Sequence, residues 1–199
     1  TGAERADADI AAGEFLRDDA HDDFAHAKAA VFFWDGQAEH AHFRHLVDDG
    51  HRDDRHRLEQ GVHALVEKPL SIEHDAASSL VSISVEKGKI LKTGFLLRFH
   101  PCVQDLHARI GLGDLGAIER IEYKRLSTRE GDSDSNCLDS LAIHGLDIAT
   151  LLLSEQSPMA ISSVIGDDRY SKLSLEFPYQ VEVEIEVGWG CKQNLGEFR

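Results

Sequence analysis

Hydrophobic positions in the first half of the chain alternate between strand spacing and helix spacing. Short apolar runs of strand length occupy AAVFFW (29–34), the start of VHALVEKPL (62–70) and ILKTGFLLRF (90–99). Between them, residues 38–60 and 71–88 carry the three- and four-residue spacing of helices, the first of the two being polar and rich in His and Asp. Strands that alternate with helices predict a parallel, doubly wound sheet, an α/β domain.

The pattern changes after about residue 100. We expect a helix over 101–110, a strand over 117–128 and a helix over 138–153, followed by the strand-like runs ISSVIG, KLSLEF and QVEVEIEVGW. The last run alternates Val or Ile with Glu over 181–187, which predicts one buried face and one acidic, solvated face. This half is predicted to be α+β, with a mostly antiparallel sheet and helices on one face. We therefore divide the chain into domains of residues 1–100 and 101–199.

The stretch GLGDLG (111–116) has the G-x-G-x-x-G spacing of loops that bind a dinucleotide pyrophosphate. Such a loop follows a strand and opens a helix, because the phosphate needs the free N–H groups of a helix N-terminus. Here the flanking patterns are reversed, since a helix precedes the glycines and a strand follows them. We expect Gly111 or Gly113 to cap the preceding helix and no phosphate to bind there.

Composition restricts the class of protein. The 199 residues carry a formal net charge of -15, which excludes nucleic acid as a partner because no basic stripe exists to contact phosphates. An anionic substrate would need a local basic pocket. Three widely spaced cysteines without a C-x-x-C pair favour a reducing cytoplasm. No apolar run reaches the length of a membrane span and no signal peptide opens the chain, so we expect no membrane association.

Two short stretches carry residue types suited to proton transfer. Lys68 follows a predicted strand, and ligands of open α/β sheets gather at the carboxyl ends of strands. A lysine that is partly buried there has a lowered pKa and can exchange protons near neutral pH. Pro69 fixes the backbone after it and can be cis. His144 and Asp147 lie three residues apart on a predicted helix, so the carboxylate can orient the imidazole.

The blocks VHALVEKPLS, GFLLRFHP with GDLGAI, and LAIHGLDIATLLL occur in an order that resembles the Gfo/Idh/MocA family of NAD(P)-dependent sugar and cyclitol oxidoreductases. The resemblance runs from about Ala30 to the end of the chain. It implies an incomplete Rossmann-like, dinucleotide-binding domain followed by a substrate-binding and dimerisation domain. It also implies a polyhydroxylated small-molecule substrate, NAD or NADP as cofactor, and a homo-oligomer formed through the C-terminal sheet.

The resemblance further implies roles for single residues. Lys68 would hold the reacting hydroxyl between nicotinamide and substrate, with Glu67 and Pro69 beside it at the cofactor. His144 would be the acid/base that takes the hydroxyl proton as the hydride leaves, and Asp147 would contact the substrate or brace the site. The remaining implied substrate-binding residues are Arg98, His100, Asp139 and Ser140. No metal ion belongs to this predicted site.

The sequence departs from the family pattern in two respects. The family usually has an aspartate four residues before the histidine, where this chain has Ser140; Asp139 lies five before, about 100° further round an α-helix. Either a local shift brings Asp139 into place or the proton relay is weakened. We also expect the chain to lack the family's nucleotide-binding first strand and helix and its last strands, and therefore to bind cofactor weakly by itself.

Two other hypotheses remain open. Eight of the 12 histidines fall within residues 21–63, and the spacing of His40, His42 and His45 would suit a transition metal if that stretch were helical. A solvated acidic helix surface explains the same pattern. The chain could also be a non-catalytic remnant or an oligomerisation module of the family.

Overall fold

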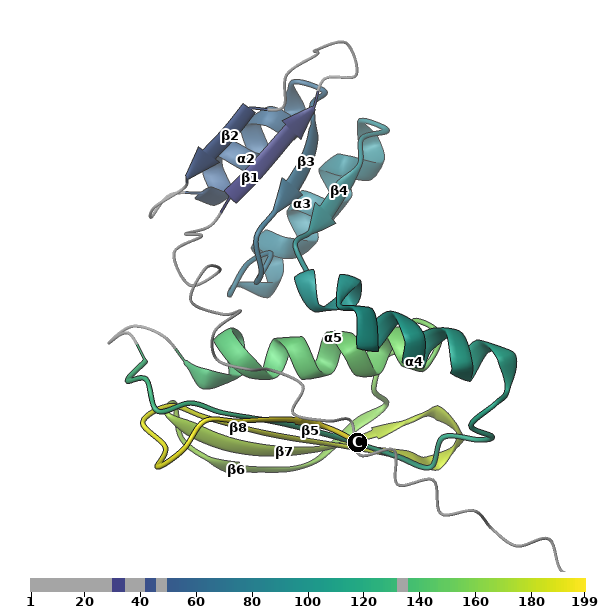
Figure 1. The fold of residues 1–199 in the computed structure, drawn as a ribbon. Helices are drawn as coiled ribbons and strands as arrows, with labels where there is room; N and C mark the ends of the chain where they lie inside the picture. The colour runs from purple at the N-terminus through teal and green to yellow at the C-terminus, as the bar shows by residue number, and fades with distance from the viewer. Residues whose placement is uncertain (1–29, 35–41, 46–49, 132–135) are drawn as a thin grey trace, which may run out of the picture. The chain divides into compact units, whose positions relative to one another are not determined.

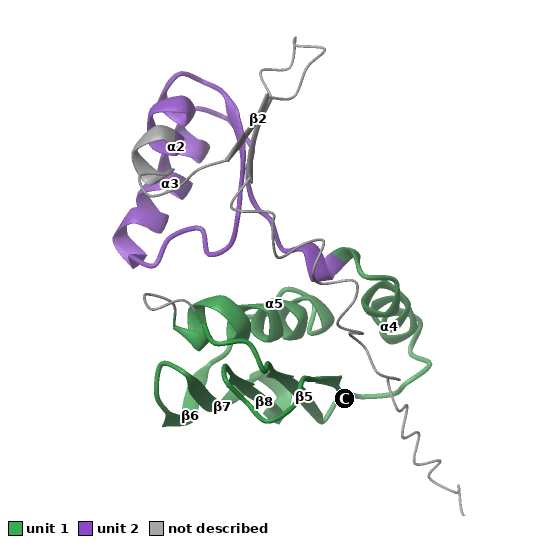
Figure 2. Ribbon diagram, turned by 60° about the vertical axis from the view of Figure 1, so that its left-hand side comes forward, with its two compact units in different colours: residues 1–17, 99–199 green, residues 18–98 purple. Residues whose placement is uncertain are grey.

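The computed structural model describes the backbone of residues 30–34, 42–45, 50–131 and 136–199, and side chains from Asp54 onward within these ranges. The described residues form two compact units, whose boundary lies between Arg98 and Phe99 (Figure 2). Unit 2 comprises the described part of residues 18–98, and unit 1 the described part of residues 99–199. Each unit has its own sheet.

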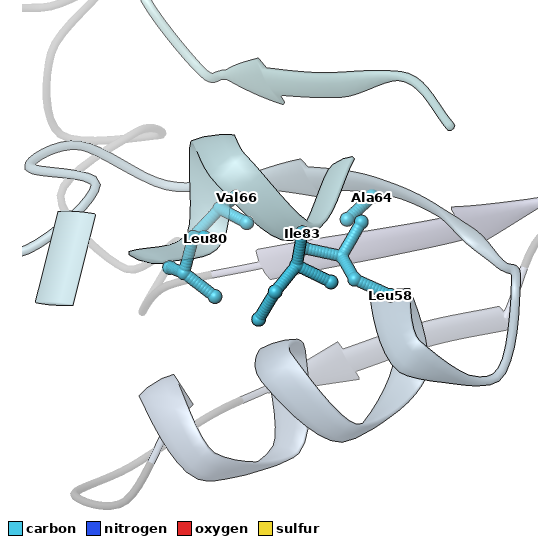
Figure 3. Close-up of a cluster of buried hydrophobic side chains, with 5 residues drawn as sticks. All are labelled: Leu58, Ala64, Val66, Leu80 and Ile83. Atoms are coloured by element: carbon cyan, nitrogen blue, oxygen red, sulfur yellow. The ribbon is translucent and has the colours of Figure 1, made fainter. Parts of the chain in front are cut away.

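Unit 2 pairs a small mixed sheet with two helices (Figure 1). Its elements are β1 (Ala30–Trp34), β2 (His42–His45), α2 (Gly50–Glu59), β3 (His63–Val66), α3 (His74–Glu86) and β4 (Leu91–Thr93), and the strand order is β2-β1-β3-β4. Five buried side chains from α2, β3 and α3 form its apolar core (Figure 3): Leu58, Ala64, Val66, Leu80 and Ile83. The two helices that follow β2 and β3 thus bury their apolar residues against β3.

The direction of the strands in this unit differs from the sequence prediction. The α/β class is as expected, but only β3 and β4 are parallel, whereas β1 is antiparallel to both β2 and β3. Parallel neighbours need a crossover of about a dozen residues, and only residues 35–41 separate β1 from β2. Apolar runs indicate that a strand is buried and do not encode its direction, so the sequence pattern could not reveal this.

Two predicted elements of unit 2 are shorter than expected. The stretch 38–60 was predicted to be helical with an interruption at residues 48–50; the structure has strand β2 before this interruption, where the prediction is wrong, and helix α2 after it, where the prediction is confirmed. Within 90–99, the strand β4 ends at Thr93 and a 3-10 helix, η1 (Leu96–Phe99), follows. The break comes at Gly94, whose N–H donates to Val66 O at 2.7 Å.

Unit 1 is a five-stranded sheet with helices on one face (Figure 1). Its elements are α4 (Pro101–Leu112), β5 (Arg120–Leu126), η2 (Leu138–Ala142), α5 (Ile143–Leu152), β6 (Ala160–Gly166), β7 (Tyr170–Phe177), η3 (Pro178–Gln180), β8 (Val181–Gly188) and β9 (Leu195–Phe198). The strand order is β6-β7-β8-β5-β9, and only β8 and β5 are parallel. The mostly antiparallel sheet predicted for this half is therefore confirmed.

Strand β8 shows how the sequence alternation sets the two faces of this sheet. Val181, Val183, Ile185 and Val187 are buried. The intervening glutamates lie on the opposite face, where Glu184 pairs with Arg120 at 2.8 Å and with Lys172 at 3.2 Å. The acidic, solvated outer face predicted from residues 181–187 is present, and basic residues of β5 and β7 partly neutralise it.

The glycine-rich stretch 111–116 ends helix α4. Gly113 is the C-cap with a φ of 77°, and the N–H groups of Gly113 and Asp114 donate to the carbonyls of Ile110 and Arg109 at 3.0 and 3.1 Å. These N–H groups satisfy the end of their own helix, so they cannot cradle a phosphate. The sequence prediction of a helix-to-strand turn is confirmed.

Among the helices of the described residues, none is long and apolar enough to cross a bilayer.

Candidate active site

The first part of the predicted site lies where two parallel strands of unit 2 end. Lys68 follows β3, beside the end of β4, and the Lys68–Pro69 peptide bond is cis. The lysine is half-buried, and this burial lowers its pKa, while the neighbouring carboxylate of Glu67 partly raises the pKa again. Loss of hydration disfavours the charged ammonium, which is the condition the sequence analysis expected at this position.

The carboxylate of Glu67 lies beside Gly94 and accepts a hydrogen bond from the backbone of Lys68. The N–H of Lys68 donates to Glu67 Oε2 at 3.3 Å. A side chain at position 94 would place its Cβ 3.3 Å from Glu67 Oε1. The absence of a side chain at Gly94 therefore leaves room for this carboxylate beside the lysine. The sequence analysis did not identify Gly94, although a glycine inside a strand pattern is a known signal of close approach.

Arg98 and His100 both take part in local structure. Arg98 is half-buried in η1, with its guanidinium carbon 5.9 Å from the centre of the Phe95 ring. His100 is the N-cap of α4, and its Nδ1 accepts the N–H of Cys102 at 3.3 Å. Nδ1 of His100 thus stabilises the start of the helix.

The second part of the predicted site lies at the start of the helix that carries His144. Asn136 caps this segment, since its Oδ1 accepts the N–H of Leu138 at 2.8 Å and its Nδ2 donates to Asp168 Oδ1 at 2.9 Å. The N–H of Cys137 donates to Asp168 O at 2.8 Å, and Cys137 is fully buried. The β6–β7 turn thus fixes where the helix begins. The capping role of Asn136 was missed in the sequence, where Asn before a helix is its usual signal.

The helix opens with a wide turn, which bears on the choice between Asp139 and Ser140. Residues Leu138–Ala142 form a π-helix, and the N–H of Ile143 donates to Leu138 O, five residues back. This bond places one more residue in the turn than an α-helix has. A residue five positions back then occupies the place that a residue four back would have in a regular helix. A wide turn is a local shift in the helix, and that it brings Asp139 toward the His144 face stays a prediction.

His144 and Asp147 occupy the first turns of α5, which packs on the sheet. His144 is half-buried with its Nδ1 buried, and Asp147 is only 7% exposed. The helix comes very close to β5 at Gly145, where an added Cβ would lie 2.5 Å from Tyr123 Cδ1. Burial raises the pKa of Tyr123 to about 12. Only glycine permits this approach, so Gly145 and Tyr123 set the height of His144 above the sheet.

The structure thus places the predicted residues in two groups. Unit 2 holds Glu67, Lys68, Pro69 and Arg98, and unit 1 holds His100, Asp139, Ser140, His144 and Asp147. That the two groups form one site, and the role of each residue, stay predictions. Gly145 and Tyr123 were not identified from sequence, although an isolated glycine in a helical pattern signals close packing.

Over residues 42–45, the structure does not contain the helix on which the alternative of a histidine metal site depends. It required a helix over His40–His45, but residues 42–45 form strand β2, and His40 lies outside the described residues. Among the described residues, no group of three or more His, Cys, Asp or Glu is arranged to hold a metal ion.

The curated proteins to which the chain is similar include dehydrogenases. No protein-family model matches the sequence. UDP-N-acetylglucosamine 3-dehydrogenase of Acidithiobacillus ferrooxidans is 32% identical over 108 residues, which cover 54% of this chain and 33% of that protein. The NAD(+)-dependent scyllo-inositol 2-dehydrogenase of Bacillus subtilis is 30% identical over 118 residues, covering 56% of this chain and 33% of that protein. The chain therefore spans about a third of the length of these relatives.

Solved structures agree with the sequence matches. The structure of GenD2 from gentamicin A biosynthesis, in complex with NAD, superposes with a TM-score of 0.62 at 20% identity, over 72% of this chain and 46% of that one. This similarity confirms the fold, an α/β domain followed by a sheet domain. In sequence and in fold, the chain is similar to oxidoreductases of the Gfo/Idh/MocA type, as its three sequence blocks predicted.

Proposed function

We propose that the protein is an NAD(P)-dependent dehydrogenase that transfers a hydride between nicotinamide and a hydroxyl-bearing carbon of a sugar, cyclitol or nucleotide sugar. The observation that carries this proposal is the half-buried Lys68 with its lowered pKa at the carboxyl end of the parallel pair β3–β4. That edge is where open α/β sheets bind their ligands. The similarity to two proteins named as dehydrogenases supports the reaction class.

Lys68 would hold the oxygen of the reacting hydroxyl. Because burial lowers its pKa, the ammonium can lend a proton or a hydrogen bond to the oxygen and take it back at modest cost. Glu67, which lies beside Gly94, partly offsets this lowering of the pKa, since the nearby carboxylate favours the ammonium.

His144 would remove the hydroxyl proton. As the C–H bond breaks and the hydride leaves, the O–H proton passes to an imidazole nitrogen of His144, so that the alcohol becomes a carbonyl group. Bound nicotinamide would supply the hydride acceptor. The buried Asp147 and the Asp139 carboxylate, realigned by the wide turn, would stabilise the imidazolium that results.

The described residues fit one end of the cofactor and not the other. The carboxyl ends of β3 and β4, with Lys68 beside them, suit the nicotinamide end. The pyrophosphate needs a glycine-rich strand-to-helix turn, and the one G-x-G-x-x-G in the sequence caps the end of α4. We therefore assign only the nicotinamide end to the described residues, and leave open whether the cofactor is NAD or NADP.

Two further expectations belong to this proposal. We place the protein in the cytoplasm, which accords with the free state of Cys102, Cys137 and Cys191. We also propose that it self-associates through the C-terminal sheet.

The proposal is tested by incubating the protein with NAD⁺ or NADP⁺ and candidate alcohols, namely UDP-N-acetylglucosamine, scyllo-inositol and myo-inositol, and following the absorbance of the reduced cofactor. Because we expect this chain to bind cofactor weakly, the cofactor is supplied in large excess, and we then expect turnover with at least one of these alcohols. Lys68→Ala and His144→Ala should each lower kcat by about 10²- to 10⁴-fold, the usual contribution of an acid/base group.

Matched controls are Lys92→Ala and His107→Ala, because both side chains are exposed and neither belongs to the predicted site. These should leave turnover within about twofold of the wild type. If wild-type protein neither reduces a cofactor nor enhances NADH fluorescence on mixing, the dehydrogenase proposal is wrong. If turnover occurs but the Lys68 and His144 variants retain it, the assigned roles are wrong.

A further inference from the structure

Hydrogen bonds from side chain and backbone close the turn that joins β6 to β7. The Oδ1 atom of Asp167 accepts the N–H groups of Arg169 and Tyr170 at 2.9 and 3.0 Å. The N–H of Asp167 donates to Tyr170 O at 2.7 Å. An aspartate that accepts from the backbone two and three residues further on stabilises a tight turn. These bonds fix the backbone around Asp168, the residue at the tip of the turn.

The same turn is joined to the ends of two neighbouring strands of the sheet. Trp189 directly follows β8, and its backbone N–H donates to Arg169 O at 2.7 Å. The guanidinium of Arg169 forms an ion pair with Glu130, which lies beyond the end of β5. The position of the turn is therefore set by the sheet.

On its other side, the turn contacts the start of the helix that carries His144. Asp168 Oδ1 accepts from Asn136 Nδ2 at 2.9 Å, and Asp168 O accepts the N–H of Cys137 at 2.8 Å. Asp167 O accepts from Ser171 Oγ at 2.7 Å and from Cys137 Sγ at 3.6 Å. Cys137 and Ser171 are 0% and 2% exposed, so the contact is closely packed. Two successive residues of the turn thus hold two successive residues of the helix start.

Asn136 connects this contact to the wide turn. Its Oδ1 accepts the N–H of Leu138 at 2.8 Å, and its main-chain oxygen accepts the N–H of Ser140, four residues on, at 3.1 Å. The N–H of Ile143 then donates to Leu138 O, five residues back. The change from α-helical to wider bonding therefore occurs directly after the residue that Asp168 holds.

The wide turn lies between two fixed points. Turns of this width are rare, because α-helical bonding is normally more favourable. Asp168 holds Asn136 at one end, and at the other end Gly145 packs against Tyr123, where an added Cβ would lie 2.5 Å from Cδ1. The wide turn accommodates one residue more than a regular helix would between these points.

Release of the first point would remove the reason for the extra residue in the turn. The segment could then return to α-helical bonding, in which successive residues are about 100° apart around the axis. A change of register by one residue would turn Asp139 by this angle relative to His144.

We propose that Asp168 is a positioning residue for the helix that carries His144. Through Asn136, it holds the start of this helix against the sheet and so retains the wide turn that sets where Asp139 lies relative to His144. This inference rests on the proposed function, because His144 is the group that would take the hydroxyl proton. Asp168 acts on kcat through the helix and not on the binding of cofactor or alcohol.

Substitution of Asp168 tests this role in steady-state kinetics. Asp168→Ala removes the acceptor and should lower kcat at least about tenfold, because a small displacement of an acid/base group is costly, with both KM values within about twofold of the wild type. Asp168→Asn keeps an oxygen that accepts from Asn136 Nδ2, so kcat should stay within about threefold of the wild type.

Glu176→Ala is the matched control. Glu176 is an exposed carboxylate of the same sheet that also accepts a side-chain hydrogen bond, from Ser162 Oγ at 2.8 Å, and it does not belong to the predicted site. Its loss removes the same charge and the same kind of bond as Asp168→Ala. This variant should leave kcat within about twofold of the wild type.

An exchange of the two side chains separates positioning from a general loss of stability. Asn136→Asp sets two carboxylates opposite each other and should lower kcat at least as much as Asp168→Ala. In Asn136→Asp/Asp168→Asn the hydrogen bond is reversed, since the amide at position 168 donates to the carboxylate at position 136. That carboxylate can still accept the N–H of Leu138, so kcat should return to within about threefold of the wild type. Costs that simply add in the double variant would contradict the proposed contact.

Amide hydrogen exchange followed by NMR measures the same contact without turnover. The N–H groups of Leu138 and Ser140 both have their acceptors on Asn136. Both should exchange at least about fivefold faster in Asp168→Ala, and at nearly the wild-type rate in Asn136→Asp/Asp168→Asn. In an active wild type, an unchanged kcat or unchanged exchange rates in Asp168→Ala would overturn the role of Asp168 alone. Absence of turnover in the wild type would instead overturn the proposed function, and with it the catalytic part of this role.

Discussion

Replacing Gly145 with alanine tests how the helix that carries His144 is seated on the sheet. The new Cβ would lie 2.5 Å from Cδ1, 2.7 Å from Cγ and 3.1 Å from Cβ of Tyr123. Carbon atoms in contact normally stay about 3.5–4.0 Å apart, so helix and strand must separate by about 1 Å or the ring must turn. The Tyr123 side chain is only 5% exposed and has little room to move.

The expected magnitude is the difference of two effects. Overpacking of a core costs about 1–3 kcal/mol, and this contact is at the severe end of that range. Alanine improves helix propensity by about 1 kcal/mol over glycine. We therefore expect Gly145→Ala to lower the free energy of unfolding by about 2 kcal/mol. Because the helix is raised at His144, kcat should fall more than cofactor affinity does.

The assay is urea-induced unfolding followed by circular dichroism, with a second glycine as control. Gly111 lies in α4 and an added Cβ would meet no atom within 4 Å, so Gly111→Ala should raise stability by up to about 1 kcal/mol. In a Tyr123→Leu background, Gly145→Ala should cost much less than in the wild type, because the opposing ring is gone. Equal costs in both backgrounds, or no cost at all, would refute the seating of α5 on Tyr123.

Two predictions concern pH. Burial raises the pKa of Tyr123 from 10.0 to about 12, so Tyr123 ionises at lower pH in the unfolded chain than in the folded one. Between pH 10 and 12 the free energy of unfolding should therefore fall by about 3 kcal/mol more in the wild type than in Tyr123→Phe. Parallel curves of unfolding free energy against pH for the two proteins would contradict this. Burial lowers the pKa of Lys68, so the unfolded chain holds its proton to higher pH, and stability should rise with pH from the lowered value up to 10.5. Lys68→Met should abolish this rise in stability, and Glu67→Gln should make the rise begin at lower pH, because the neighbouring carboxylate is lost. Both effects are measured as the free energy of unfolding against pH. If the rise persists in Lys68→Met, another group causes it.

Periodicity predicted most of unit 1 because its elements are amphipathic. The Val/Glu alternation of β8 and the reversed flanks of Gly111–Gly116 depend on local spacing, and both are found as expected. In unit 2 the same reasoning predicted strands but not their directions, since β1 and β3 are apolar in either orientation. The stretch around His42 is rich in His, Asp and other polar residues, and its few apolar positions were interpreted as helical spacing although they fit a strand as well.

The part of the candidate site that could be predicted is the part defined by a residue type that directly follows a strand. Lys68 and its cis proline lie at the end of β3, as the sequence suggested. The sequence left open whether a local shift brings Asp139 into place before His144. One inserted residue can be accommodated by a π-turn, or it can move the aspartate to another face of the helix. Gly145 was not singled out, since its need for close packing depends on Tyr123, which lies in a different element far back in the chain.

The central claim is that Lys68 and His144 act on one hydroxyl group. A crystal structure of the protein with NADH and a bound alcohol tests this claim directly. We expect Lys68 Nζ and His144 Nε2 both within about 3 Å of the same hydroxyl oxygen, the reach of a hydrogen bond. A structure in which the two side chains lie on opposite sides of the molecule, with no cavity shared between them, would contradict the account.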